Sequence, residues 1–168
     1  MAKIEIDSSY IDLAKSGNKY AMKAMFQTFI AEDENIISVE YLGSYGIIFS
    51  TQSFVCVTDS KVAVMEYGPF GKLIYSDAFI EEINSGVIYQ PSVFLLYFVG
   101  IILVCTIWGI LFLNLWIRLY YKKNKSGMFW SVKEGVNIYA FANRSKISRV
   151  NEVWRIVSYL RCKRKKTF

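Results

Sequence analysis

The chain of 168 residues contains no histidine and only three cysteines. Histidine is the commonest general base and the commonest metal ligand, so its absence argues against most hydrolase triads and most transition-metal sites. The cysteines, at positions 56, 105 and 162, are far apart and form no paired motif. We therefore expect reduced thiols and no disulfide framework. The first ten residues contain no apolar core, so we expect no cleaved secretory signal peptide.

Recognised catalytic motifs are missing as well. The sequence has no P-loop, no GxGxxG fingerprint, no nucleophile elbow and no carboxylate cluster with calcium-binding spacing. The acidic runs 32–34 and 81–82 are interpreted as solvated loops or helix ends, because adjacent carboxylates do not converge on one reacting group. We therefore predict a protein that is not an enzyme and that binds no cofactor or metal.

Charge is distributed very unevenly along the chain. Residues 1–92 carry six lysines and twelve acidic residues, a net charge of 6 − 12 = −6. Residues 118–168 carry fourteen lysines and arginines and two acidic residues, a net charge of 14 − 2 = +12. Such asymmetry indicates contact with an anionic partner on the basic side.

Between these regions, residues 93–117 form an apolar run of 25 residues without a charged side chain. As a helix this run would span ~37 Å, more than the ~30 Å hydrocarbon core of a bilayer. The sequence therefore predicts a membrane segment. The following lysines and arginines place the C-terminal side in the cytoplasm. We expect an integral protein of the cytoplasmic (inner) membrane whose soluble parts face the cytoplasm.

Two topologies use this segment differently. A single pass would put residues 1–90 and 120–168 on opposite sides of the membrane, so the two parts could not share a sheet. A shallow hairpin over 88–121 would return the chain to the same side, with each arm crossing about one leaflet. Uninterrupted hydrophobicity favours the pass. The complementary strand counts of the two halves favour the hairpin, which is the preferred interpretation.

Aromatic and cationic residues near the apolar run and at the C-terminus are the candidate site residues. Amphipathic rings and cations favour the headgroup layer, and each cation near an anionic leaflet adds ~1 kcal/mol of attraction. The predicted contacts with the membrane interface and anionic lipids are Trp116, Arg118, Tyr120, Tyr121, Lys122, Lys123, Lys125, Arg161, Lys163, Arg164, Lys165 and Lys166. Alternatively, these cations only set the orientation of the protein in the membrane and its solubility. Nucleic-acid binding is not expected.

Periodicity predicts short N-terminal helices, strands and a long C-terminal helix. A cap at Asp7 or Ser8 and a break at 16–18 precede a second helix over 19–30. Strands are predicted at 36–42, 45–51, 53–57, 62–67, 72–76, 127–132 and 136–142, with tight turns at 58–61 and 68–71. From residue 144 the period becomes helical, with Ile147, Val150, Trp154, Val157 and Leu160 on one stripe. We predict that Trp154 anchors this helix in the core.

Two stretches carry a family resemblance, SFVCVTDSKVAVMEYGPFGKLIYSDAFIEEI at 53–83 and GVNIYAFANRSKISRVNEVWRIVSYL at 135–160. Their strand order and threonine-aspartate turn resemble bacterial pleckstrin-homology-like (PH-like) domains with an inserted membrane segment. The resemblance implies an α+β fold: a small antiparallel β-barrel or sandwich of about seven strands closed by a C-terminal helix. A hydrophobic membrane helix or helical hairpin would interrupt it, and short helices would precede it. The expected parts are a helical segment 1–31, the PH-like domain 34–87 and 126–161, the membrane insert 88–121 and the basic tail 162–168.

The resemblance and the charge pattern together predict a membrane-embedded, non-enzymatic binding or scaffold module. It would recognise a partner protein or anionic lipid at the cytoplasmic membrane face. A protein partner or a homo-oligomer is expected. The alternatives are a small membrane effector that oligomerises and perturbs the bilayer, and an accessory subunit of a membrane complex. No GxxxG motif supports assembly through the apolar run, which weakens the effector alternative.

Overall fold

Two short helices open the chain in the structure, a computed structural model that describes residues 6–45, 50–90, 92, 94–104, 126–132 and 137–165. Helix α1 is Ser8–Lys15 and helix α2 is Lys19–Gln27. Asp7 caps α1, as predicted, by accepting a hydrogen bond from the backbone N–H of Ser9 at 2.9 Å. Asn18 caps α2 in the same way, following Gly17 at φ +96°. The second helix ends three residues earlier than predicted.

Four antiparallel strands form the first sheet, sheet A, in the order β1-β2-β3-β4. The strands are β1 Ile36–Tyr45, β2 Thr51–Thr58, β3 Lys61–Tyr67 and β4 Leu73–Phe79, with the 3-10 turn η1 Pro69–Gly71 before β4. The alternation along β3 shows that both faces of this sheet are covered. Val62 and Val64 join one hydrophobic cluster, whereas Ala63 and Met65 join another.

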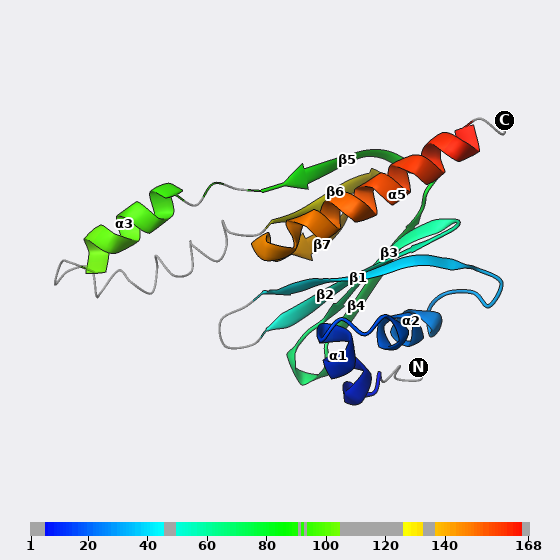
Figure 1. The fold of residues 1–168 in the computed structure, drawn as a ribbon, viewed down its shortest axis with the longest axis horizontal. Coiled ribbons are helices and arrows are strands. Elements are labelled where there is room, and N and C mark those ends of the chain that lie inside the picture. Colours follow the sequence, from blue (N-terminus) through cyan, green and yellow to red (C-terminus); the bar gives the residue numbers. More distant parts are fainter. Residues whose placement is uncertain are drawn as a thin grey trace.

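Three antiparallel strands form the second sheet, sheet B, in the order β5-β6-β7. The strands are β5 Ile83–Tyr89, β6 Ser126–Val132 and β7 Asn137–Ala142. Strand β5 precedes the apolar run and β6 follows it, yet they pair, with Tyr89 opposite Gly127. The apolar run therefore leaves and re-enters the fold at one end of sheet B. Helix α3, Phe94–Val104, lies beyond that end and apart from both sheets (Figure 1).

The strand assignments need two corrections. The predicted strand 45–51 is not a separate element, because β1 continues through Gly43 to Tyr45 and β2 begins at Thr51; residues 46–49 lie outside the described residues. Strand β5 was not predicted. The polar residues Asn84 and Ser85 and the following Gly86 interrupt the strand pattern in its sequence. In the structure both polar residues are exposed, and Gly86 lies under the Trp154 side chain of the C-terminal helix.

The predicted closed barrel is wrong for the described strands, which form two separate sheets. Strands β1 and β7 approach each other, and the Asn143 N–H donates to the Leu42 carbonyl at 2.7 Å. A register shift between Tyr41 and Gly43 interrupts β1 there, and Gly43 has φ +116°. A Cβ on Gly43 would lie 2.5 Å from the Asn143 Cβ. The chain after β7 therefore turns away at this contact, and β1 and β7 do not pair as neighbouring strands of one sheet.

The predicted membrane helix is also contradicted, and with it the predicted location as an integral protein of the cytoplasmic membrane. Helix α3 has 11 residues, which at ~1.5 Å per residue is about half of the ~30 Å hydrocarbon core. Within the described ranges, no helix is both long and apolar enough to cross a bilayer. Residues 105–125, over which the predicted segment would continue, lie outside the described residues.

Helix α5, Ile147–Lys165, follows the 3-10 turn η2 Arg144–Lys146 and packs along both sheets (Figure 1). It buries Val150, Val153 and Val157, whereas Ile147, Trp154 and Leu160 are half-buried against the core, so the predicted stripe is confirmed as the face that packs on the core. Trp154, predicted as the core anchor, is only half-buried, although it packs against the same cluster. Among the described residues, Trp130 of β6 is the largest fully buried side chain.

A second hydrophobic cluster lies between sheet A and the N-terminal helices. Met22, Met25 and Phe26 of α2 pack there against Phe54 of β2. An ion-pair triad ties this layer to α5. Its centre is Glu40 of β1, which is buried and lies 3.3 Å from the Lys19 ammonium and 2.9 Å from the Arg149 guanidinium. Residues more than a hundred positions apart are thus joined at the middle of β1.

Candidate functional site

Most of the candidate lipid contacts lie outside the described residues. These are Trp116, Arg118, Tyr120, Tyr121, Lys122, Lys123, Lys125 and Lys166. Arg161, Lys163, Arg164 and Lys165 belong to the last turns of α5. Within the described part of the chain, the structure therefore brings together only the cations of the α5 end.

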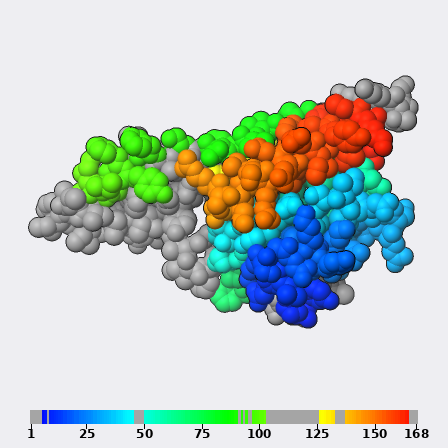
Figure 2. Space-filling view, in the orientation of Figure 1, coloured from blue at the N-terminus to red at the C-terminus, as the bar shows by residue number. Residues whose placement is uncertain are grey.

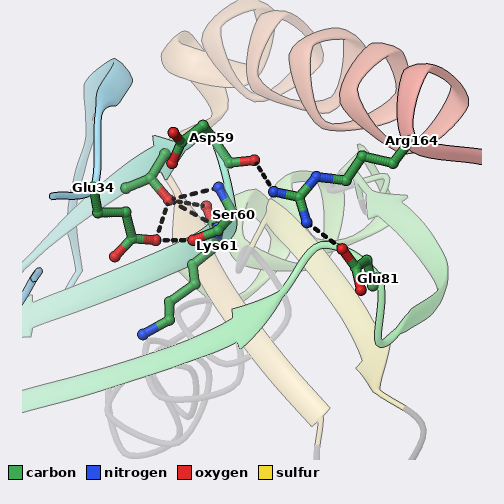
Figure 3. A network of polar contacts seen from close by, with 7 residues as sticks. Glu34, Asp59, Ser60, Lys61, Glu81 and Arg164 are labelled. Carbon is green, nitrogen blue, oxygen red and sulfur yellow. Dashed lines mark hydrogen bonds and ion pairs between the residues drawn. The ribbon is translucent and has the colours of Figure 1, made fainter. Parts of the chain in front are cut away.

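Two of these cations contact residues in and next to the two sheets. The Arg161 guanidinium donates to the Asn84 carbonyl of β5 at 3.2 Å. Arg164 donates to the Asp59 carbonyl at 2.7 Å and forms an ion pair with Glu81, in the turn between β4 and β5 (Figure 3). These guanidinium groups are engaged in holding the end of α5 against two turns.

The turn bound by Arg164 is the predicted threonine-aspartate turn between β2 and β3. Thr58 Oγ1 accepts hydrogen bonds from the backbone N–H groups of Ser60, at 3.2 Å, and Lys61, at 2.8 Å. The hydroxyls of Thr58 and Ser60 both donate hydrogen bonds to the Glu34 carboxylate, which comes from the segment between α2 and β1 (Figure 3). This role of Glu34 was not predicted from the sequence, because its partners are more than twenty residues away.

These contacts lower the pKa of the Glu34 carboxyl group. Burial opposes its ionisation, but the hydrogen bonds from Ser60 and Thr58 and the charge of Lys61 outweigh burial and lower its pKa. Since a hydroxyl donor favours the charged form, the carboxylate stays ionised and keeps the turn in place. The cluster in Figure 3 is thus a structural clamp that joins four separate segments of the chain.

A groove of about 730 Å³ lies between the start of β1 and the C-terminal half of α5. In Figure 2 the red surface of α5 lies beside the light-blue surface of this region. Ile37, Ile156 and Leu160 supply apolar walls, and Tyr159 is 66% exposed beside them. Ile156 and Leu160 also pack against the edge of the core. The apolar surface of α5 therefore extends from the core into the groove.

The rim of this groove is charged. Arg155 and Lys163 line it together with a single acidic residue, Glu152. Lys163 was predicted to bind lipid and Leu160 to face the core, whereas Ile156 and Tyr159 were not predicted as site residues. The signal that could have identified them is that the apolar residues between 153 and 160 cover a wider part of the helix surface than a single core-facing stripe.

The described residues supply no group of three His, Cys, Asp or Glu side chains placed to hold a metal ion. Burial, and then the charge of Glu34, raises the pKa of the Cys56 thiol to about 12, so it is protonated and unreactive at neutral pH. Cys162 is exposed on α5. No protein-family model and no curated protein matches this chain.

Proposed function

We propose that the protein is a non-enzymatic binding module, and that the groove between β1 and α5 takes up an acidic, amphipathic segment of a partner protein. The groove carries this proposal, because it combines apolar walls with a mainly cationic rim.

The apolar part of the groove suits a partner side chain. Ile37, Ile156 and Leu160 form a surface on which an apolar anchor loses contact with water on binding. Tyr159 adds a large, mostly exposed ring with a polar end. Tyrosine is over-represented among residues that dominate interface energies, because its ring buries much area at little conformational cost. We therefore place the main affinity at Tyr159.

The charged rim selects the chemistry of the partner. Arg155 and Lys163 outnumber Glu152, so the groove has a net positive charge. Carboxylates of a partner segment would complement these cations, which increases association rates and excludes cationic segments. The partner segment should therefore carry one or two apolar anchors flanked by Asp or Glu.

Peptide selection tests the proposal. Short random peptides displayed on phage are selected against the purified full chain, and synthetic versions of the winners are measured by fluorescence anisotropy. We expect winners that combine apolar and acidic residues. Tyr159→Ala should weaken their binding by at least about tenfold, as for a dominant interface residue. Tyr20→Ala is the matched control, because Tyr20 is 87% exposed on α2, away from the groove.

Vesicle binding is the competing outcome. If anionic vesicles bind the chain, and Tyr159→Ala leaves that binding unchanged while no acidic peptide is enriched, then the partner is not a protein segment. Peptides that bind the Tyr159→Ala variant as tightly as the natural chain would also contradict the groove as the binding site.

A further inference from the structure

A separate cleft of about 340 Å³ opens between the two sheets, at the end of β1 and beside β7. Val64 and Glu66 of β3 lie on one side, and Ile74 of β4 lies next to them. Tyr139 and Phe141 of β7 lie on the other. The cleft exists because the sheets do not close into a barrel, which leaves part of the inner face of sheet A beyond the cover of sheet B.

Aromatic rings form one wall of the cleft. The rings of Tyr45 and Phe141 pack at 4.5 Å between centroids, with 56° between their planes. The Tyr139 hydroxyl donates to the Ser126 carbonyl at 3.3 Å, and a Cβ on Gly127 would lie 3.0 Å from the Tyr139 Cζ. The backbone of β6 therefore holds the Tyr139 ring in a defined position.

A single carboxylate provides the charge of the cleft. The Tyr45 hydroxyl donates to one oxygen of Glu66 at 2.9 Å, which leaves the other oxygen able to accept further hydrogen bonds. Among the described residues, no lysine or arginine forms an ion pair with Glu66. Glu66 follows Val62 and Val64 on the inner face of β3, where Ser53 of β2 and Ile74 of β4 lie opposite it on the neighbouring strands.

The two tyrosines stay neutral beside this carboxylate. Burial, and then Glu66, raises the pKa of Tyr45 to about 12. Burial, followed by Glu66 and Tyr89, also raises the pKa of Tyr139. Both hydroxyls therefore keep their protons at neutral pH, and the cleft presents one negative charge among neutral aromatic rings.

We propose that this cleft binds a small organic cation with an ammonium group. An ammonium within ~6 Å of an aromatic centroid is attracted by the negative face of the ring, and here the carboxylate of Glu66 adds charge neutralisation. The volume lies at the lower end of the range for small-molecule pockets, ~300–1,000 Å³. The apolar walls at Val64, Ile74 and Phe141 suit alkyl substituents on the ammonium better than they suit a hydrated metal ion.

The test compares choline with its neutral isostere, 3,3-dimethylbutan-1-ol, by titration of the full chain with NMR detection of tyrosine ring resonances. The two probes have the same shape and differ in charge. We expect choline to shift the Tyr45 and Tyr139 resonances saturably, and the neutral isostere to bind on the order of tenfold more weakly. Equal binding of the two probes would overturn the proposal, because only shape would then be recognised.

Variants separate the carboxylate from the rings. Glu66→Gln keeps a hydrogen-bond acceptor for Tyr45 but removes the charge, and it should weaken choline binding on the order of tenfold. Tyr139→Phe keeps the ring and should bind choline nearly as well as the natural chain, whereas Tyr139→Leu should bind it on the order of tenfold more weakly. Asp33→Asn is the control for loss of one negative charge, since Asp33 is exposed between α2 and β1. Unchanged choline binding by Glu66→Gln, or equal loss in Asp33→Asn, would contradict the assigned site.

Discussion

At the scale of single residues, Gly86 is the point where α5 rests on sheet B. It lies in β5 opposite Trp130, and the Trp154 ring lies directly over it. A Cβ at this position would be 2.2 Å from the Trp154 Cζ3 atom. The half-buried position of Trp154 is therefore possible only because β5 carries no side chain there.

Gly86→Ala should destabilise the protein by about 1–3 kcal/mol, because the new methyl group displaces Trp154 from its packed position. Gly68→Ala is the control. At Gly68 the nearest atoms would lie 3.4 Å from the Cβ and φ is −105°, which any residue adopts. Urea denaturation of both variants measures the effect, and similar midpoints for the two would contradict the packing of Trp154 on Gly86.

Glu34 gives the fold a defined dependence on acid. Its folded pKa lies below its usual value of 4.5. Its contacts therefore stabilise the fold above that value, and the contribution is lost as pH falls through the folded pKa. The difference in urea midpoint between the natural chain and Glu34→Gln should be largest at neutral pH and shrink below about pH 5. The exposed neighbour substitution Glu32→Gln should show no such trend; a constant difference for Glu34→Gln would contradict the role of its charge.

At the scale of elements, α5 is held at both ends by ion pairs with segments far away in the sequence. Arg149 near its start contacts Glu40 of β1 at 2.9 Å. Arg164 near its end contacts the turn between β2 and β3 and the turn between β4 and β5. Between them, the three buried valines of α5 fill the space between the sheets. The helix is thus packed along its middle and pinned at its ends.

Arg164→Gln should release the last turns of α5 without unfolding the domain. The ion pair is partly exposed, so the cost in global stability should be below about 1 kcal/mol. Amide hydrogen exchange should become faster in the last turns of α5 and in the turn before β5, whereas β6 should keep its protection. Arg155→Gln is the control, because Arg155 is exposed on the same helix. Equal exchange in both variants would show that Arg164 does not pin the helix.

At the scale of the whole molecule, one hydrophobic cluster joins the parts of the chain before and after the apolar run. Val57 and Val64 of sheet A meet Met128 and Trp130 of sheet B and Val157 of α5. Strands β5 and β6 are also hydrogen-bonded partners across that run. The two parts therefore form one folded unit, and a change in one should be felt by the other.

Trp130→Ala should destabilise the unit by about 3–5 kcal/mol, because it leaves a large cavity at a side chain that is 1% exposed. Unfolding followed by tyrosine fluorescence and by hydrogen exchange of β2 and β3 should shift together to lower denaturant. Tyr20→Ala should leave the midpoint nearly unchanged. Loss of protection confined to β5, β6 and β7, with β2 and β3 intact, would show that the two sheets unfold independently.

Local patterns in the sequence determined several elements. The predicted strands 53–57 and 62–67 and the turn between them are confirmed as β2, β3 and the clamped turn at Thr58. Asp7 caps α1 as predicted, and the helical stripe after residue 144 corresponds to α5. These features depend on alternation, capping and turn chemistry among residues close in the chain, which is why sequence alone is sufficient to find them.

Tertiary structure decided the features that depend on distant contacts. Strand β5 is interrupted by the weak strand formers at 84–86, and it pairs with β6 and carries Trp154 above Gly86. Asn143 and Gly43 meet where β1 and β7 approach each other, and the cleft at Glu66 opens between the two sheets. The charges of Glu34 and Arg164 acquire their roles from partners more than twenty residues away. Sequence periodicity reports which side chains share a face, but only packing determines which faces meet.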